Sequence, residues 1–461
     1  MPERKYTYYD FTLSLCPECL KRVDAKIVFE DDMVYMLKRC PEHGASKVRI
    51  ADDIAYYKNI RNYNKPSEMP YTFNTKTHYG CPYDCGLCPD HEQHSCLTIV
   101  EVTDRCNLTC PTCYAGSSPH YGRHRTLEEI RNMLDAVVAN EKEPDVVQIS
   151  GGEPTIHPQF FDILDYAKTL PIRHLMINTN GIRIAKDFEF AKRLKTYSPD
   201  FEIYLQFDSF DDHVLREMRG ADLREIRQKA LDHLNILNLS TTLVVTLQKG
   251  LNDHEIGKII DFGLQQRCVR GVTFQPTQIA GRLEGFNTDT DRITLTEVRR
   301  KILEQSPVFN EDDLIPVPCN PDALVMGYAL KLGGEVFPLT RYINPADLLD
   351  NSKNTIVYEQ DEALHGKMIA LFSTGNSVTC AEENLQSIMC CLPQIDAPDL
   401  GYDNLFRVII MQFIDAYNFD VRAVKKSCVH IVNKDYKIIP FETMNLFYRD
   451  DKRKILDNLI G

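Results

Sequence analysis

The chain has 461 residues, of which 43% are hydrophobic and 26% charged, with 22 glycines and 24 prolines. This length predicts two to four domains, and the composition is that of a soluble globular protein. The formal net charge of -13 argues against nucleic acid as a main partner, because an acidic chain gains nothing from counterion release. No stretch of about 18 apolar residues predicts a transmembrane segment, and the first residues do not resemble a signal peptide. We therefore expect a cytoplasmic protein.

The N-terminal part carries two short knuckles that predict a metal site. Cys16 and Cys19 form the first knuckle, and Cys40 and His43 form the second, with the strand-like segment KIVFEDDMVYML between them. Grouped cysteines in a reducing compartment more often bind metals than form disulfides. Three cysteines and a histidine suit structural zinc in a zinc ribbon. A rubredoxin-like iron is the alternative that the sequence leaves open.

A second group of cysteines lies in the segment GCPYDCGLCPDHEQHSC. Four thiolates can close a metal site, and an auxiliary [4Fe-4S] cluster is favoured over zinc because the group directly precedes a further cysteine motif. Two histidines of the same segment could also bind a metal, but we expect them to be solvated loop residues. The predicted ligands are Cys81, Cys85, Cys88 and Cys96, and the two histidines are His91 and His94.

Beyond residue 96, short β-branched runs alternate with segments of helical periodicity. The segment 126–140 has such periodicity, and Thr126 with Glu129 predicts a capping box at its start. Six strands that alternate with helices predict a parallel sheet of βα units, in which the loops after the strands carry the chemistry. The predicted strands span residues 97–103, 146–151, 175–181, 202–208, 241–247 and 271–277.

The third cysteine group follows the first of these strands in the segment EVTDRCNLTCPTCYAG. Cys106, Cys110 and Cys113 are spaced to bind three irons of a [4Fe-4S] cluster and to leave the fourth iron open to a chelating ligand. The turn Gly151-Gly152-Glu153-Pro154 follows the second strand. Its glycines allow close approach of the backbone to a ligand, and Glu153 could accept a hydrogen bond from an ammonium group.

The CxxxCxxC loop and the GGEP turn together resemble the radical S-adenosylmethionine (SAM) superfamily. The resemblance implies a partial (β/α)6 TIM-like barrel and a cluster whose open iron is chelated by SAM. It also implies reductive cleavage of SAM to a 5′-deoxyadenosyl radical that abstracts hydrogen from an unactivated carbon. One departure is Thr112, where the family usually has an aromatic residue. By resemblance, the residues expected to contact SAM or substrate are Gly151, Gly152, Glu153, Pro154, Asn178, Asn180, Gln206, Asp208 and Gln275.

Within the superfamily, the tandem cysteine motifs and the segments 275–282 and 413–445 are similar to the tetraether lipid synthase group. That group implies hydrogen abstraction from a lipid chain and carbon–carbon coupling. The C-terminal part departs from the pattern: Cys319 and Cys428 match, but Glu442 stands where a cysteine is expected. We therefore expect a second auxiliary cluster to be lost, unless a cysteine among Cys380, Cys390 and Cys391 takes part.

These observations predict four segments: a rubredoxin-like or zinc-ribbon domain (1–70), an auxiliary cluster segment (71–98), a radical SAM barrel (99–300) and a C-terminal α+β domain (301–461). The amphipathic, apolar-rich pattern of residues 406–419 predicts a buried core helix. The predicted enzyme activates a C–H bond by lyase- or transferase-type chemistry on a lipid or another small molecule. Its expected partner is a low-potential electron donor such as ferredoxin or flavodoxin.

Two alternatives remain open at this point. One is a radical SAM methylase or tailoring enzyme that acts on a pterin-like or other small molecule. The other, from a different class, is a non-catalytic iron–sulfur scaffold or electron carrier. A long apolar tunnel would favour a lipid, whereas a polar cup would favour a small molecule.

Overall fold

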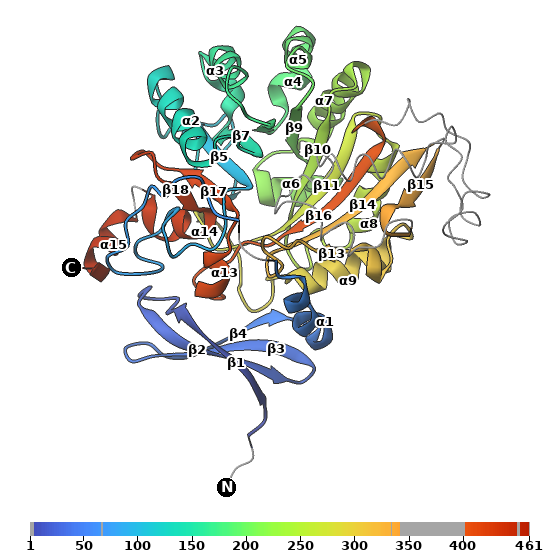
Figure 1. Cartoon of the computed structure of the whole chain (residues 1–461). Helices are drawn as coiled ribbons and strands as arrows, with labels where there is room; N and C mark the ends of the chain where they lie inside the picture. Colours follow the sequence, from blue (N-terminus) through green and yellow to red (C-terminus); the bar gives the residue numbers. More distant parts are fainter. Residues whose placement is uncertain (1–3, 66–67, 333, 342–401, 450–451, 461) are drawn as a thin grey trace, which may run out of the picture.

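The N-terminal residues form a small antiparallel sheet that lies apart from the main sheet (Figure 1). The computed structural model describes residues 4–65, 68–332, 334–341, 402–449 and 452–460. Alternating apolar residues such as Ala25, Ile27, Val34 and Met36 fill one face of the small sheet. Its elements are β1 (Thr7–Leu15), β2 (Arg22–Glu30), β3 (Met33–Cys40) and β4 (Gly44–Ala51), followed by α1 (Ile54–Asn59).

Lys38 joins this small sheet to the C-terminal part of the chain. The side chain is buried, and its Nζ donates to the carbonyl oxygens of Leu15, Ala416 and Tyr417 at 2.8, 2.8 and 2.7 Å. Three acceptors satisfy all three donors of the ammonium group. Lys38 therefore links the small sheet to the C-terminal part of the chain through hydrogen bonds.

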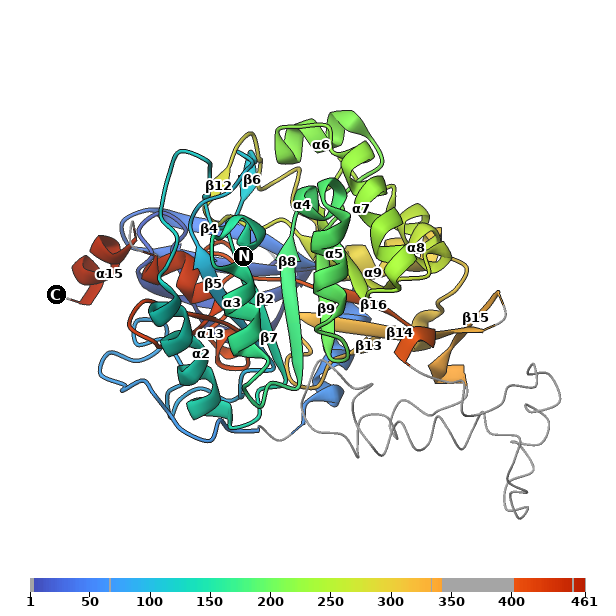
Figure 2. The ribbon, with the colours of Figure 1, turned by 90° about the horizontal axis from the view of Figure 1, so that it is seen from above.

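The main sheet contains the six predicted strands in sequence order, each parallel to the next. Helices cover its outer face, as the two views show (Figures 1 and 2). The strands are β5 (Leu97–Thr103), β7 (Val146–Gly151), β8 (His174–Thr179), β9 (Phe201–Gln206), β10 (Thr241–Leu247) and β11 (Val269–Pro276).

The helices between these strands bury an apolar stripe against the sheet. In the first of them, Ile130, Leu134 and Val137 pack into the core, and Thr126 with Glu129 forms the expected capping box. The helices are α2 (Leu127–Glu141), α3 (Phe160–Ala167), α4 (Ile182–Lys186), α5 (Phe188–Lys195), α6 (Asp212–Arg219), α7 (Arg224–Leu237), α8 (Ile256–Gln265) and α9 (Leu295–Gln305).

The C-terminal part adds strands to both edges of the main sheet. At one edge β16 (Leu405–Met411) pairs parallel to β11, and β14 (Leu324–Leu332), β13 (Ile315–Pro316) and β15 (Glu335–Pro338) follow antiparallel. At the other edge β17 (Val429–Val432) pairs parallel to β5 and carries β18 (Ile438–Pro440). The short elements that remain there are α13 (Val421–Lys425), α14 (Phe441–Thr443), the π-helical η8 (Met444–Tyr448) and α15 (Arg453–Ile460).

The sheet is an open, partial barrel of mixed direction. Its order runs from β13 to β18, and these two ends do not pair among the strands that the structure describes. The expected α/β fold with a partial barrel and an N-terminal zinc-ribbon unit is confirmed. Within the described ranges, no helix is long and apolar enough to cross a membrane.

The prediction of a core helix over 406–419 is wrong. Residues Leu405–Met411 form the buried strand β16, and an irregular segment follows. A short apolar run of this length fits a buried strand as well as a buried helix, and its β-branched residues Val408, Ile409 and Ile410 favour the strand.

Candidate radical SAM site

The three cysteines of the CxxxCxxC motif lie in the loop that follows β5, beside a cavity. Cys106, Cys110 and Cys113 all line this cavity, and Cys110 is buried. Arg282 fixes the loop from the other side, since its Nε donates to Cys110 O at 2.6 Å and its Nη2 to Ser117 O at 2.8 Å. In addition, β6 (Thr112–Cys113) pairs with β12 (Arg282–Leu283). The Arg282 side chain and the short strand pairing therefore hold the cysteine loop in place beside the cavity.

The glycines of the GGEP turn allow two loops to pack together. A Cβ on Gly152 would lie 2.1 Å from Arg105 O, and a Cβ on Gly151, whose φ is 121°, would lie 2.2 Å from Thr103 O. Two backbone hydrogen bonds join the GGEP turn to the end of β5 and the loop after it: Gly152 N donates to Thr103 O at 2.8 Å, and Glu153 N donates to Arg105 O at 3.0 Å. The packing of the cysteine loop against the turn therefore requires glycine at both positions, whether or not a ligand also approaches them.

Glu153 has structural partners within the protein. Its buried carboxylate accepts from Thr155 N at 3.1 Å, Thr179 Oγ1 at 2.8 Å and Asn180 N at 2.9 Å. Burial raises the pKa of Glu153, while these hydrogen bonds oppose the rise. The residue lines the cavity and also ties the GGEP turn to the end of β8.

Asp208, which the sequence places among the SAM-contacting residues, does not line the cavity. It is fully buried and binds Arg219 and Arg227 instead. Burial alone would raise the pKa of Asp208, but the two guanidinium groups hold it below its ordinary value. Contact between Asp208 and SAM therefore stays a prediction. In the structure, the carboxylate follows its strand as expected and holds two arginines that line the cavity.

Arg219 and Arg227 were missed in the sequence. They lie on α6 and α7 among other charged residues, so nothing in the pattern separates them from a solvated helix face. Arg219 also donates to Gln206 Oε1 at 3.2 Å and to Thr246 Oγ1 at 2.9 Å. Arg227 is 2% exposed, and its Nε and Nη1 have no hydrogen-bond partner among the described residues.

A row of amides forms one wall of the cavity. Gln206 Nε2 donates to Asn178 Oδ1 at 2.8 Å, Asn178 Nδ2 donates to Ser150 Oγ at 3.3 Å, and Gln275 Nε2 donates to Tyr204 Oη at 3.0 Å. The expected residues Asn178, Gln206 and Gln275 are therefore brought together. Asn180 also lines the cavity, and its Nδ2 donates to Asn107 Oδ1 at 2.7 Å. Pro154, the last residue of the turn, is buried and does not line the cavity.

Aromatic rings contribute to the cavity lining as well. Phe413 and Phe441 stack with centroids 4.1 Å apart, and Tyr114 lies 5.1 Å from Phe441. The lining therefore combines hydrogen-bonding amides with aromatic surface, which is the mixture expected of a site for a polar organic molecule.

The residues present fit a [4Fe-4S] cluster with SAM bound to it. Three cysteines from one loop can supply three thiolates and leave one iron open. Arg227 lines the same cavity, and its two buried donors without a partner suit an anionic group such as the SAM carboxylate. The amide row offers both donors and acceptors to the rest of the ligand.

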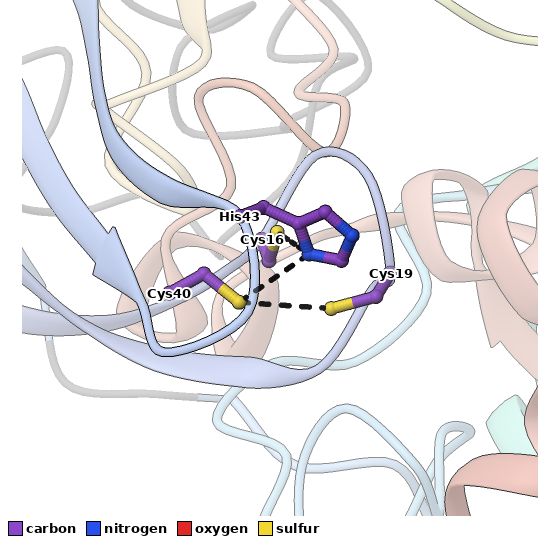
Figure 3. A group of neighbouring side chains, drawn as sticks. All are labelled: Cys16, Cys19, Cys40 and His43. Atoms are coloured by element: carbon purple, nitrogen blue, oxygen red, sulfur yellow. Dashed lines mark hydrogen bonds between the residues drawn. The ribbon is translucent and has the colours of Figure 1, made fainter.

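The N-terminal group of three cysteines and a histidine comes together as expected (Figure 3). Cys16 Sγ and Cys40 Sγ lie 3.6 and 3.5 Å from His43 Nδ1, and Cys19 Sγ lies 3.9 Å from Cys40 Sγ. These spacings fit four ligands around one tetrahedral metal ion.

The predicted ligands of the second cysteine group lie in one segment: Cys81, Cys85 and Cys88 are in the loop before β5, and Cys96 directly precedes that strand. Cys96 Sγ also lies within 4.8 Å of the sulfur atoms of Cys319 and Cys428. The sequence alone did not indicate this contact, which follows from the pairing of β17 with β5. His91 and His94 are buried, contrary to the expectation of solvated histidines. Cys380, Cys390 and Cys391 lie outside the described residues.

Comparison with known proteins agrees with this architecture. Residues 100–263 match the radical SAM superfamily model, and residues 8–52 match the HMPTM N-terminal zinc ribbon domain. The chain is 31% identical to 7,8-dihydro-6-hydroxymethylpterin dimethyltransferase of Methanocaldococcus jannaschii, over 95% of this chain and 94% of that protein. It is 27% identical to GTP 3′,8-cyclase of Pseudomonas fluorescens, over 51% of this chain and 69% of that protein.

Among solved structures, Streptococcus suis SuiB bound to S-adenosylmethionine matches with a TM-score of 0.37 and 18% identity, over 45% of this chain and 46% of that one. The site and the near full-length relative define the class: the chain belongs to the radical SAM superfamily. Membership implies a [4Fe-4S] cluster and SAM, and the zinc-ribbon match and the cysteine groups suggest further metal sites.

Proposed function

We propose that this radical SAM enzyme methylates a pterin-like small molecule. The observation that carries the proposal is the 31% identity to a pterin dimethyltransferase along nearly the whole of both chains, zinc ribbon included. This relative favours the small-molecule alternative over lipid coupling.

The cavity lining also supports a small polar substrate. A pterin is a flat heteroaromatic ring with hydrogen-bonding edges. The amides of Gln206, Gln148 and Gln275 could bind such edges, while the rings of Phe413 and Phe441 offer apolar surface for its face. A bound alkyl chain would displace water from these amides and offer no hydrogen bond in its place, which costs free energy.

In this proposal each residue has a defined task. Cys106, Cys110 and Cys113 bind the catalytic cluster, and Arg219 and Arg227 bind the SAM carboxylate. When bound, the cluster and SAM supply reductive cleavage of SAM and with it a hydrogen-abstracting radical. Cys81, Cys85 and Cys88 bind an auxiliary cluster, and the ribbon binds zinc. A low-potential donor such as ferredoxin or flavodoxin supplies electrons.

The decisive experiment uses the reconstituted full-length protein with dithionite, 7,8-dihydro-6-hydroxymethylpterin and excess SAM. One SAM molecule is cleaved to methionine and the radical, and a second donates the methyl group and leaves as S-adenosylhomocysteine. We expect 5′-deoxyadenosine to form in a pterin-dependent manner, and mass spectrometry to show methyl groups added to the pterin. Cys106→Ala should abolish both products, whereas Cys268→Ala, which changes a buried cysteine outside the cavity, should retain them.

Other outcomes contradict the proposal in distinct ways. Stimulation of 5′-deoxyadenosine by a long-chain lipid but not by pterins would restore the lipid alternative. Absence of 5′-deoxyadenosine with every substrate, from a protein whose clusters are shown to be present, would support the non-catalytic scaffold.

A further inference from the structure

Three cysteines from distant parts of the sequence meet in the interior. Cys96, Cys319 and Cys428 are each buried, and their sulfur atoms lie within 4.8 Å of one another. Cys319 Sγ and Cys428 Sγ are 3.3 Å apart, and all three cysteines are free of disulfides. We propose that these thiolates, with His94 as fourth ligand, bind a single tetrahedral metal ion of the zinc class.

The spacing favours one ion over an iron–sulfur cluster. Metal–ligand lengths of about 2.3 Å for sulfur and 2.0–2.1 Å for nitrogen put tetrahedral sulfurs about 3.8 Å apart and a sulfur and nitrogen about 3.5 Å apart. In a cubane cluster each thiolate binds a different iron, so the sulfurs stand at separate corners. The sulfur atoms of Cys106, Cys110 and Cys113, the predicted cluster ligands, do not all lie within 4.8 Å of one another, in contrast to those of Cys96, Cys319 and Cys428.

His94 stands at the edge of the three thiols. Its Nε2 lies 3.5 Å from Cys96 Sγ, which is the separation that two ligands of one zinc ion would have. Its Nδ1 lies 3.1 Å from Glu141 Oε2. A carboxylate on the second nitrogen fixes the tautomer and orientation of a metal-binding imidazole. The imidazole lies outside the group of thiols whose sulfur atoms are within 4.8 Å of one another, so the proposed coordination requires it to move toward Cys319 and Cys428.

The position of the site gives it a structural task. Cys96 directly precedes β5 and Cys428 directly precedes β17, and Leu97 N donates to Cys428 O at 3.0 Å. Cys319 belongs to the connection between β13 and β14, at the opposite edge of the open sheet. An ion bound here joins the two edges that the strand order leaves unpaired.

The site is also separate from the catalytic loop. Cys96 and Cys106 flank opposite ends of β5, whose seven residues span roughly 23 Å. The proposed ion therefore acts on stability and shape, independently of the proposed methylation.

The test measures zinc, iron and acid-labile sulfide in the full-length protein and in matched variants. Cys428→Ser should lose one zinc per chain with iron and sulfide unchanged. Cys268→Ser is the control, because Cys268 is equally buried and also directly precedes a strand, β11. It should retain every metal. Loss of iron and sulfide in Cys428→Ser, or no loss of metal, overturns the proposal.

A second variant keeps the test valid if Cys428→Ser does not fold. Cys19→Ser disables the ribbon site alone, so its remaining zinc reports the proposed site. We expect one zinc per chain with three sulfur ligands and one nitrogen ligand by X-ray absorption at the zinc edge. Absence of zinc from this variant overturns the proposal.

The fourth ligand is tested by competition with a chelator in the Cys19→Ser background. His94→Ala should release zinc most readily, and Glu141→Gln should weaken retention about 10–100-fold through the lost orientation. Glu442→Gln is the matched control, because Glu442 is a buried carboxyl that bonds to Ser427 beside Cys428. If Glu442→Gln releases zinc and His94→Ala does not, His94 is not a ligand.

Discussion

Asp208 accepts two hydrogen bonds from Arg219, from Nε at 2.8 Å and from Nη2 at 2.7 Å. Arg227 Nη2 donates to the same carboxylate at 2.8 Å. One fully buried anion thus holds two cations at the cavity wall. Without it, the two guanidinium groups would repel each other beside the cysteine loop.

Asp208→Asn should therefore reduce both stability and SAM binding. Removing one partner of a buried ion pair costs about 3–5 kcal/mol, because charge is left uncompensated. We expect the affinity for SAM, measured by calorimetry on the folded variant, to fall by at least about tenfold, or about 1.4 kcal/mol.

The control for this change is Asp222→Asn. Asp222 pairs with Arg224 at the surface, where the two side chains are 28% and 47% exposed. Such pairs contribute about 0–1 kcal/mol, so stability and SAM affinity should barely change. Unaltered SAM affinity in folded Asp208→Asn would show that the arginines do not bind the ligand.

Gly152→Ala should disrupt the cysteine loop. Its Cβ would lie 2.1 Å from Arg105 O, a backbone atom that cannot move without moving Cys106. We expect lower iron and sulfide content per chain after reconstitution. Gly285→Ala is the comparison: it has a φ of 71° but open space around the added Cβ, so only about 1 kcal/mol of backbone strain is expected. Full cluster content in Gly152→Ala would contradict the packing argument.

The strands and the catalytic loop were predictable because their signals are local. Cys106, Cys110 and Cys113 are close in sequence, and β-branched runs mark β5 and its neighbours. The partners of Asp208 were not predictable, since Arg219 and Arg227 belong to helices rich in other charges. The meeting of Cys96 with Cys428 depends on β17 pairing with β5, a long-range contact that no local pattern encodes.

Lys38→Met should loosen the attachment of the N-terminal sheet. The change removes three hydrogen bonds and leaves the carbonyls of Leu15, Ala416 and Tyr417 without their donor. Each buried acceptor left unsatisfied costs about 1–3 kcal/mol. We expect faster proteolytic release of the N-terminal sheet, with zinc retained at Cys16 and its partners. Lys26→Met, at an exposed position of the same sheet, should leave the proteolysis rate unchanged.

Glu202 and Arg407 should make stability depend on pH in acid. Arg407 Nη2 lies 2.9 Å from both carboxylate oxygens of Glu202, and His174 Nε2 lies 3.2 Å from one of them. Burial alone would raise the pKa of Glu202, but Arg407 and His174 hold it well below its ordinary value. The unfolded chain then takes up a proton at higher pH than the folded chain does.

The contribution of Glu202 is therefore fully present above its unfolded pKa of about 4.3 and is lost as pH falls below that value. Urea unfolding at pH 7, 5 and 4 should show Glu202→Gln less stable at pH 7, by about 3–5 kcal/mol, because Arg407 loses its buried partner. The deficit should shrink modestly toward pH 4, because the unfolded form of the unchanged protein begins to take up a proton on Glu202 there while its folded form stays ionised. Glu189→Gln, which changes an exposed pair with Lys192, should follow the unchanged protein at every pH. A Glu202→Gln deficit that stays constant down to pH 4 would mean that the carboxylate charge contributes nothing to folding.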